Sequence, residues 1–345
     1  MVGPGEIARR ARGRVSSRLE SLPILALSVH SACNCRCVMC DIWKANSEKR
    51  EISSDDLARY VESIRALRVQ RVMLTGGEPL LHRNLWALCS QLQALHIRIT
   101  LVTTGLLVEN HAMEIAACID TVVISLDGPR MMHDGIRRVR GGFDRIARGM
   151  MALHAQHPTP RLIARSVVQR GNADVIDETI AAAHRMGFDE ISFLAADVSS
   201  TAFNRPEPWP APRVAEIALE KNEVEMLEIA IDRAVRGHRE LFENGFVAGG
   251  RSSLDRIAQY YRALAGEDAF PVVQCNAPWV SAVMEPGGVV RPCFFHPIYG
   301  SASEGLADTL NSAAAIAFRR ELDVATNDTC RRCVCSLNLP LTSRV

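Results

Sequence analysis

Four of the chain's eleven cysteines lie in the segment ACNCRCVMC, residues 32–40. Cys33, Cys37 and Cys40 have the spacing C-x3-C-x2-C, which lets one loop bind three corners of a cubane iron–sulfur cluster. A structural zinc ion would require four ligands, usually from separated C-x2-C pairs. Three thiolates leave one iron open for chemistry. Cys35 is a possible fourth ligand, but alternate residues on a tight loop diverge, so we interpret it as a non-ligand that points away.

Five further cysteines follow residue 270. Cys275 and Cys293 are separated by seventeen residues, and CRRCVC supplies Cys330, Cys333 and Cys335. Two cysteine pairs are typical of a zinc ribbon, and composition alone does not reject that site. Because the first 22 residues lack the apolar centre of a signal peptide, the thiols indicate metal or redox chemistry rather than disulfides. The expected location is the cytoplasm.

Charge and hydropathy argue against other partners. The net charge is +1, which gives no global attraction to nucleic acid. No run of about 18 apolar residues exists, so we expect no membrane contact through a spanning helix. A basic helix near the N-terminus would touch anionic lipid or a phosphorylated substrate, although a solvated face is the simpler interpretation. Its arginines are Arg9, Arg10, Arg12, Arg14 and Arg18.

The elements that must position these residues follow an alternating pattern. Apolar runs suited to buried parallel strands alternate with helical periodicity. The predicted strands are Ile24–His30, Arg71–Thr75, Arg98–Thr103, Thr121–Leu126, Leu162–Val168 and Glu190–Leu194. The predicted helices are Ser54–Ala66, Leu85–Leu95, Phe143–His154 and Asp174–Met186. Six such βα units form a parallel sheet, either open or curled into part of a barrel.

Polar and glycine-rich motifs follow the predicted strands. The cysteine segment follows the first strand, and the later strands end in TGGEP (75–79), TTG (103–105), SLDG (125–128) and AADVSS (195–200). Active sites of parallel barrels and open α/β sheets are built at the carboxyl ends of their strands. Together, the motifs therefore predict one site on one face of the sheet.

The chain is expected to have four parts. These are a basic helix at 1–23, a core at 24–200, a linker and helical segment at 201–270, and a small metal-bearing domain at 271–345. The linker prediction rests on four prolines within NRPEPWPAPR, residues 204–213, which are typical of extended structure.

The cysteine segment, followed by GGEP and SLDGPRMMHDGIR, resembles the radical S-adenosylmethionine (SAM) superfamily over about the first 200 residues. The resemblance implies an α/β fold, a partial (β/α)6 TIM-type barrel, in which SAM binds the open iron of a [4Fe–4S] cluster. Reductive cleavage of SAM would give a 5'-deoxyadenosyl radical that abstracts hydrogen from a substrate. A flavodoxin- or ferredoxin-type protein is the expected electron donor.

The same resemblance assigns cofactor contacts. The GGE segment would meet the methionine amino group, since glycine backbone permits close approach and a carboxylate accepts from an ammonium. Ser125 and Asp127 match positions near the ribose. Met39 stands where an aromatic residue often holds the adenine, and its thioether can pack on a ring. The expected cofactor-binding residues are Met39, Gly76, Gly77, Glu78, Thr104, Ser125, Asp127 and Arg137.

The C-terminal cysteines resemble the auxiliary-cluster domain of the SPASM/twitch subgroup, with the pattern C-x(9–15)-G-x4-C followed by C-x2-C. Gly288 occupies the glycine position. The resemblance implies a second [4Fe–4S] cluster, with Cys335 as an alternative ligand or a spare thiol. Because the sequence ends ten residues after Cys335, we expect the shortened twitch form. The implied ligands are Cys275, Cys293, Cys330 and Cys333.

The expected reaction is a net two-electron oxidation of a small, sugar-like metabolite, with the second cluster accepting one electron. Only about two dozen residues precede the first strand, too few for the leader-binding domain of many peptide maturases. Peptide or protein maturation, lipid modification and redox-neutral epimerisation are the alternatives, and a non-enzymatic iron–sulfur or zinc scaffold is the rival from another class. Asp197 is the candidate general base, and Arg165 is the candidate to face SAM or substrate.

Overall fold

Six parallel strands, which pair in chain order, form the frame of the molecule. The computed structural model describes residues 2–345. All six strands begin and end within one residue of the predicted bounds, which confirms the α/β assignment and the partial barrel. They are β1 (Ile24–His30), β2 (Arg71–Gly76), β3 (Arg98–Thr103), β4 (Thr121–Ser125), β5 (Arg161–Val168) and β6 (Glu190–Ala195).

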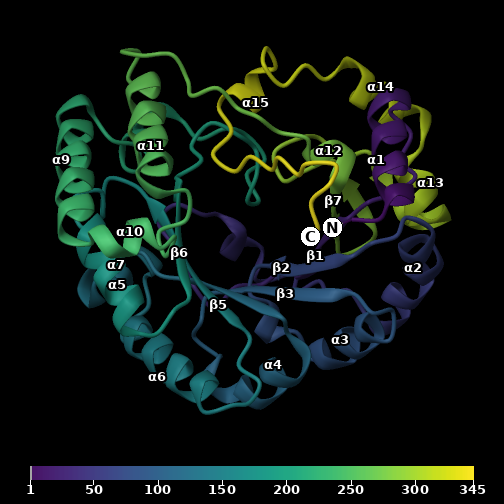
Figure 1. Ribbon diagram of the computed structural model, residues 1–345, viewed down its shortest axis with the longest axis horizontal. Helices are drawn as coiled ribbons and strands as arrows, with labels where there is room; N and C mark the ends of the chain where they lie inside the picture. The colour runs from purple at the N-terminus through teal and green to yellow at the C-terminus, as the bar shows by residue number, and fades with distance from the viewer. Residues whose placement is uncertain (1) are drawn as a thin grey trace.

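Helices cover the outer side of this curved sheet (Figure 1). The four predicted helices are present, and two short ones that the periodicity did not predict, α4 and α5, flank β4. The set is α2 (Ser54–Ala66), α3 (Leu85–Gln93), α4 (Ala112–Cys118), α5 (Arg130–Arg137), α6 (Gly142–His154) and α7 (Ile176–Arg185). Further helices after β6 are α8 (Ala211–Ala215), α9 (Lys221–Gly237), α10 (Arg239–Glu243) and α11 (Gly250–Leu264). None of the helices within residues 2–345 is both long and apolar enough to cross a membrane.

The C-terminal part continues the barrel sheet instead of forming a separate one. β7 (Ser281–Glu285) pairs in parallel with β1, on the side away from β2. Two antiparallel strands follow, so the sheet has the order β6-β5-β4-β3-β2-β1-β7-β8-β9. The remaining elements are α12 (Ala277–Val280), β8 (Val289–Arg291), β9 (Gly300–Ser301), α13 (Leu306–Leu310), α14 (Ala313–Glu321) and α15 (Asp328–Arg331).

The basic helix α1 (Pro4–Ser16) is hydrogen-bonded to the C-terminal tail, residues 339–343. The buried guanidinium of Arg10 donates to the carbonyl of Ser343 at 2.8 Å, and Arg14 donates to the carbonyl of Leu339 at 2.9 Å. These two arginines therefore hold the fold together. Arg12 and Arg18 remain exposed, so the solvated face applies to them and not to Arg10.

The proline-rich segment 204–213 is not a spacer. The indole of Trp209 donates to Asp41 Oδ2 at 2.8 Å, and the amide of Asn204 donates to the Asp41 carbonyl at 3.2 Å. The guanidinium of Arg205 lies 3.9 Å from the centre of the Trp209 ring. This segment is therefore packed on the residues directly after Cys40, which corrects the prediction of a linker.

Candidate functional site

The cysteine loop, residues 32–40, follows β1 and is held by its surroundings. The Asn46 side chain bonds the Cys33 backbone twice at 2.9 Å, accepting from the amide and donating to the carbonyl. The amides of Arg36 and Val38 donate to the last carbonyls of α5, at 3.3 and 3.0 Å. Because helix-terminal carbonyls lack partners within their helix, α5 serves as an acceptor surface that fixes the loop.

Each predicted ligand sulfur of the loop accepts an N–H. Such bonds favour the charged form of sulfur, as a cluster ligand requires. They run from the Cys35 amide to Cys33 Sγ at 3.5 Å, from the Ile42 amide to Cys40 Sγ at 3.5 Å, and from Arg137 Nη1 to Cys37 Sγ at 3.6 Å.

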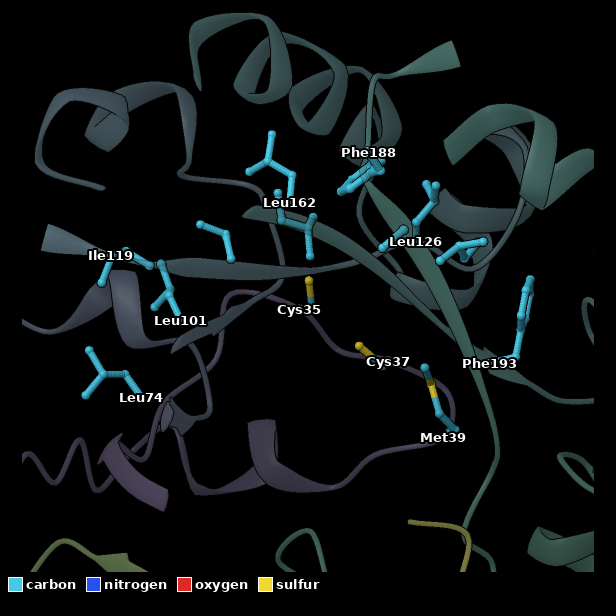
Figure 2. Close-up of a cluster of buried hydrophobic side chains, with 14 of the residues drawn as sticks. Cys35, Cys37, Met39, Leu74, Leu101, Ile119, Leu126, Leu162, Phe188 and Phe193 are labelled. Carbon is cyan, nitrogen blue, oxygen red and sulfur yellow. The ribbon is translucent and has the colours of Figure 1, made fainter. Parts of the chain in front are cut away.

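The fourth thiol of the loop, Cys35, is 1% exposed and extends toward the strands (Figure 2). Hydrogen bonding with Cys33 and Cys37, together with burial, raises the pKa of Cys35 far above its usual range. The same bond is the largest influence on Cys37, whose pKa falls to about 6. Cys35 thus lies in the protein interior beside Cys33 and Cys37, and its assignment as a non-ligand stays a prediction.

Asp127 and Arg137 form a buried ion pair beside the loop. Arg137 Nε donates to Asp127 Oδ2 at 2.5 Å, and the Val167 amide donates to Asp127 Oδ1 at 2.8 Å. Burial alone would lower the pKa of Arg137, but Asp127 and Cys37 raise it. Asp127 is 0% exposed, and its carboxylate fixes the orientation of Arg137.

The two glycines of TGGEP bring that turn against the start of the cysteine loop. A Cβ added to Gly76 would lie 2.4 Å from the His30 carbonyl oxygen, and one added to Gly77 would lie 2.1 Å from that of Ala32. The Gly77 amide donates to His30 at 2.8 Å. The absence of side chains at both glycines therefore lets this turn pack directly against the backbone at the start of the cysteine loop. The sequence predicted that the same glycines allow a close approach of SAM.

Glu78 is fully buried and ties β3 to this turn. Its Oε1 accepts from the Thr103 hydroxyl at 2.7 Å and the Leu80 amide at 3.0 Å, and its Oε2 accepts from the Thr104 amide at 2.7 Å. The Thr104 hydroxyl donates to Asn34 at 3.0 Å, inside the cysteine loop. Glu78 is 0% exposed, and these bonds fix the turn against the cysteine loop.

A polar row crosses the inner face of β4, β5 and β6. Ser125 pairs in register with Arg165, and Arg165 pairs with Ser192. All three are half-buried, whereas their strand neighbours face the helices, and Arg165 Nε donates to Ser192 Oγ at 3.2 Å. Arg165 is therefore available to a molecule inside the barrel. Met39 is buried in the same cluster as Phe193 of β6 (Figure 2).

Asp197, after β6, is not a free base. Its Oδ2 accepts from Arg205 at 2.9 Å and from the Ser200 hydroxyl at 2.5 Å. Arg205 also donates to the Asp197 carbonyl at 2.8 Å, and both side chains are buried. This pair anchors the segment that covers the cysteine loop, so the candidate base is a structural anchor.

The C-terminal thiols lie within electrostatic reach of one another. The second thiol site consists of Cys275, Cys293, Cys330, Cys333 and Cys335. Burial and, to a smaller extent, the neighbouring thiols raise the pKa of Cys293 to about 11 and that of Cys330 to about 12. Within residues 2–345, no three His, Cys, Asp or Glu side chains converge tightly enough for a single metal ion.

Three of the four predicted ligand sulfurs of this site also accept N–H groups: Cys275 from the Ala277 amide at 3.5 Å, Cys333 from the Cys335 amide at 3.4 Å, and Cys293 from the amides of Phe295 and His296. His296 Nε2 lies 3.3 Å from the fourth sulfur, Cys330 Sγ. Cys335 differs from them, because its exposed side chain lies within the electrostatic reach of Arg165. Although the surrounding protein raises the pKa of Cys335 overall, Arg165 acts to lower it, so this thiol lies near the arginine of the polar row.

Two positioning residues were missed from the sequence. Asn46 carries no signal, because an asparagine six residues after the last loop cysteine is ordinary surface composition. His296 does carry a signal in the sequence, because it follows Cys293 with C-x2-H spacing, which is typical of metal-site segments.

Comparisons with known proteins match both sites. The sequence model of the Radical SAM superfamily matches residues 27–180, and that of an iron–sulfur cluster-binding domain, SPASM, matches residues 275–334. Mycofactocin maturase MftC of Mycolicibacterium smegmatis is 30% identical over 158 residues, 45% of this chain and 40% of the relative. A GTP 3',8-cyclase of Rhodopseudomonas palustris is 31% identical over 180 residues, 49% of this chain and 51% of the relative. The chain thus matches about half the length of these relatives or less.

Solved structures share the fold at lower identity. Streptococcus suis SuiB bound to its precursor peptide SuiA has a TM-score of 0.60 at 16% identity, covering 95% of this chain and 74% of SuiB. The enzyme anSMEcpe with bound AdoMet and the Cp18Cys peptide has a TM-score of 0.62 at 18% identity, covering 90% and 88%. These likenesses establish the architecture of both parts.

Proposed function

The chain is a radical SAM protein with a C-terminal SPASM iron–sulfur domain, and from this premise we propose that it modifies a peptide by hydrogen-atom abstraction. Its cofactors are SAM and [4Fe–4S] clusters. When bound, SAM and the first cluster supply abstraction of hydrogen from an unactivated C–H bond. The observation that carries the proposal is that one molecule holds a three-thiol loop at the carboxyl end of β1 and a separate group of thiols in the C-terminal part, between residues 275 and 335.

Different residues of the chain are assigned to the two clusters, to SAM and to the substrate. Cys33, Cys37 and Cys40 hold the first cluster, with Arg137 donating to the second of these sulfurs. The second cluster is bound by Cys275, Cys293, Cys330 and Cys333. Met39, Ser125 and Arg137 contact SAM, whereas Gly76, Gly77, Glu78, Thr104 and Asp127 position the segments that do so. Arg165 faces the substrate.

A peptide substrate is favoured over the small, sugar-like metabolite. Of the relatives, MftC is described as a maturase, and the SuiB and anSMEcpe structures contain peptides. The row of Ser125, Arg165 and Ser192 offers polar groups that match backbone amides and carbonyls. A small metabolite is the second candidate, because other relatives are described as GTP 3',8-cyclases.

The net change proposed is an oxidation of the substrate by two electrons. The substrate would lose one hydrogen atom to the radical that SAM supplies, one electron to the second cluster, and one proton to solvent or a base. An external one-electron donor of the flavodoxin or ferredoxin type reduces the first cluster. A cavity of about 540 Å³ reaches Cys33 from outside, lined also by Lys49 and Arg83, and offers this donor an approach.

The test uses the anaerobically reconstituted full chain with SAM, a reductant and short peptides encoded beside its gene, deuterated on carbon. Deuterium in the 5'-deoxyadenosine released with the deuterated peptide is expected, and the same peptide without deuterium should lose two mass units. The Cys33→Ala, Cys37→Ala, Cys40→Ala variant is the control and should release no 5'-deoxyadenosine. Turnover of a metabolite below about 1 kDa, with every peptide unchanged, would overturn the peptide assignment and leave the radical SAM assignment intact.

A further inference from the structure

His296 lies against the second thiol site and is 5% exposed. It belongs to the segment between β8 and β9. Its Nε2 lies 3.3 Å from Cys330 Sγ, and its ring packs edge-on against Phe318, with 5.0 Å between ring centres and 71° between planes. The ring is therefore held in one orientation by packing, with one nitrogen directed at a ligand sulfur.

The direction of this hydrogen bond follows from the sulfur. A cysteine sulfur bound to iron carries no proton and can only accept. The histidine must then be in the tautomer with its proton on Nε2. Four thiols of this site already complete a cluster, and the ring points at one of those sulfurs, so His296 is a donor to the ligand and not a ligand itself.

We propose that His296 raises the reduction potential of the second cluster by donating this hydrogen bond to Cys330 Sγ. An N–H directed at a ligand sulfur stabilises the reduced, more negative cluster relative to the oxidised one. The sulfurs of Cys275, Cys293 and Cys333 accept from backbone amides, which a substitution leaves in place. His296 is thus the side chain through which the sequence sets how readily this cluster accepts an electron. The inference rests on the second cluster and not on the identity of the substrate.

The test is an EPR-monitored redox titration of the reconstituted full chain carrying Cys33→Ala, Cys37→Ala and Cys40→Ala, so that the second cluster is observed alone. His296→Phe keeps the ring packing on Phe318 and removes the donor. We expect the ratio of reduced to oxidised cluster at a fixed potential to fall about tenfold, which is a shift of about 59 mV to lower potential for one electron. His296→Gln, whose amide nitrogen reaches the position of Nε2, should restore most of the shift.

The matched control is His184→Phe, because His184 makes a similar edge contact with Phe246, at 5.4 Å, away from both thiol sites. An unchanged potential in His296→Phe with four irons bound would overturn the proposal. If His296→Phe fails to bind the cluster, His296→Gln decides: a near-normal potential supports the proposal, and a lowered one overturns it. Strong coupling of a histidine nitrogen to the cluster in pulsed EPR would make His296 a ligand and also overturn it.

Discussion

The cysteine loop and the second thiol site offer the same ligand chemistry, but the chain builds them in opposite ways. The loop places its thiols within eight residues and is braced by β2, α5 and the segment after β6. The second site gathers its thiols from residues 275 to 335, and its position depends on the sheet pairing of β7 and on the tail held by α1. A compact loop is fixed by its near neighbours, whereas a dispersed site is fixed by the tertiary fold as a whole.

The largest expected effect separates the two sites by their iron. Reconstituted protein should carry about eight irons per chain, four in each cluster. Cys33→Ala, Cys37→Ala and Cys40→Ala together should leave about half of this iron and abolish SAM cleavage. Cys330→Ala with Cys333→Ala should remove the other half and retain SAM cleavage. Iron analysis and chromatography of 5'-deoxyadenosine measure both, and loss of all iron in either variant would mean that the sites are not independent.

Gly77→Ala tests the bracing of the loop by the neighbouring turn. The new Cβ would lie 2.1 Å from the Ala32 carbonyl, a backbone atom that cannot rotate away. We expect a cost of about 3 kcal/mol in the free energy of unfolding and loss of the first cluster before the second. Gly135→Ala is the control, since a Cβ there meets nothing within 4 Å and should be neutral or slightly stabilising. Equal behaviour of the two variants in urea unfolding would refute the bracing.

His133, on α5 beside the loop, makes the barrel site sensitive to acid. Burial lowers the pKa of His133 to about 4, and its Nδ1 accepts from the Asp127 amide at 3.2 Å. As the pH falls from 6.5 to 4, the unfolded chain binds a proton that folded His133 does not, so the free energy of unfolding should fall by about 3 kcal/mol. Below pH 4 this contribution is fully lost. His133→Asn should flatten the profile in that window, whereas substitution of the exposed His154 should leave its slope unchanged.

Arg10→Ala tests the dependence of the second site on a distant helix. It leaves the carbonyls of Leu341 and Ser343 without their donor, which costs about 1 to 3 kcal/mol. The second cluster should lose iron while the first keeps it. Arg12→Ala is the control, because Arg12 pairs with Glu20 on the surface and does not touch the tail. Iron loss confined to the first cluster would contradict this dependence.

The smallest expected effect comes from Cys35→Ala. Because Cys35 is buried and is not one of the predicted ligands, its removal should cost about 1 kcal/mol of stability and leave both clusters and SAM cleavage intact. Cys89→Ala removes an equally buried thiol from the core and controls for the lost volume. Loss of the first cluster in Cys35→Ala alone would make Cys35 a ligand.

The sequence predicted the six strands because buried parallel strands are uniformly apolar and end in polar turns, as Ile24–His30 does. It did not predict α5, because this helix has only eight residues and contains Gly135, which disfavours helix formation. It identified the motifs of the site but not the partners of their side chains. Glu78 and Asp127 appear in the sequence as free carboxylates, and only the fold reveals that Thr103 and Arg137 occupy them. Local spacing encodes ligands, whereas the partner of a buried charge depends on contacts distant in sequence.

The pairing of β1 with both β2 and β7 has a consequence for synthesis of the protein on the ribosome. Until Ser281–Glu285 has emerged, one edge of β1 exposes unpaired backbone groups, although the barrel strands on its other side are complete. Such an edge is a template for pairing with another nascent chain. Fragments that end before β7 should therefore aggregate, and slower translation at low temperature should not rescue them, because the strand that covers the edge is missing and not merely late.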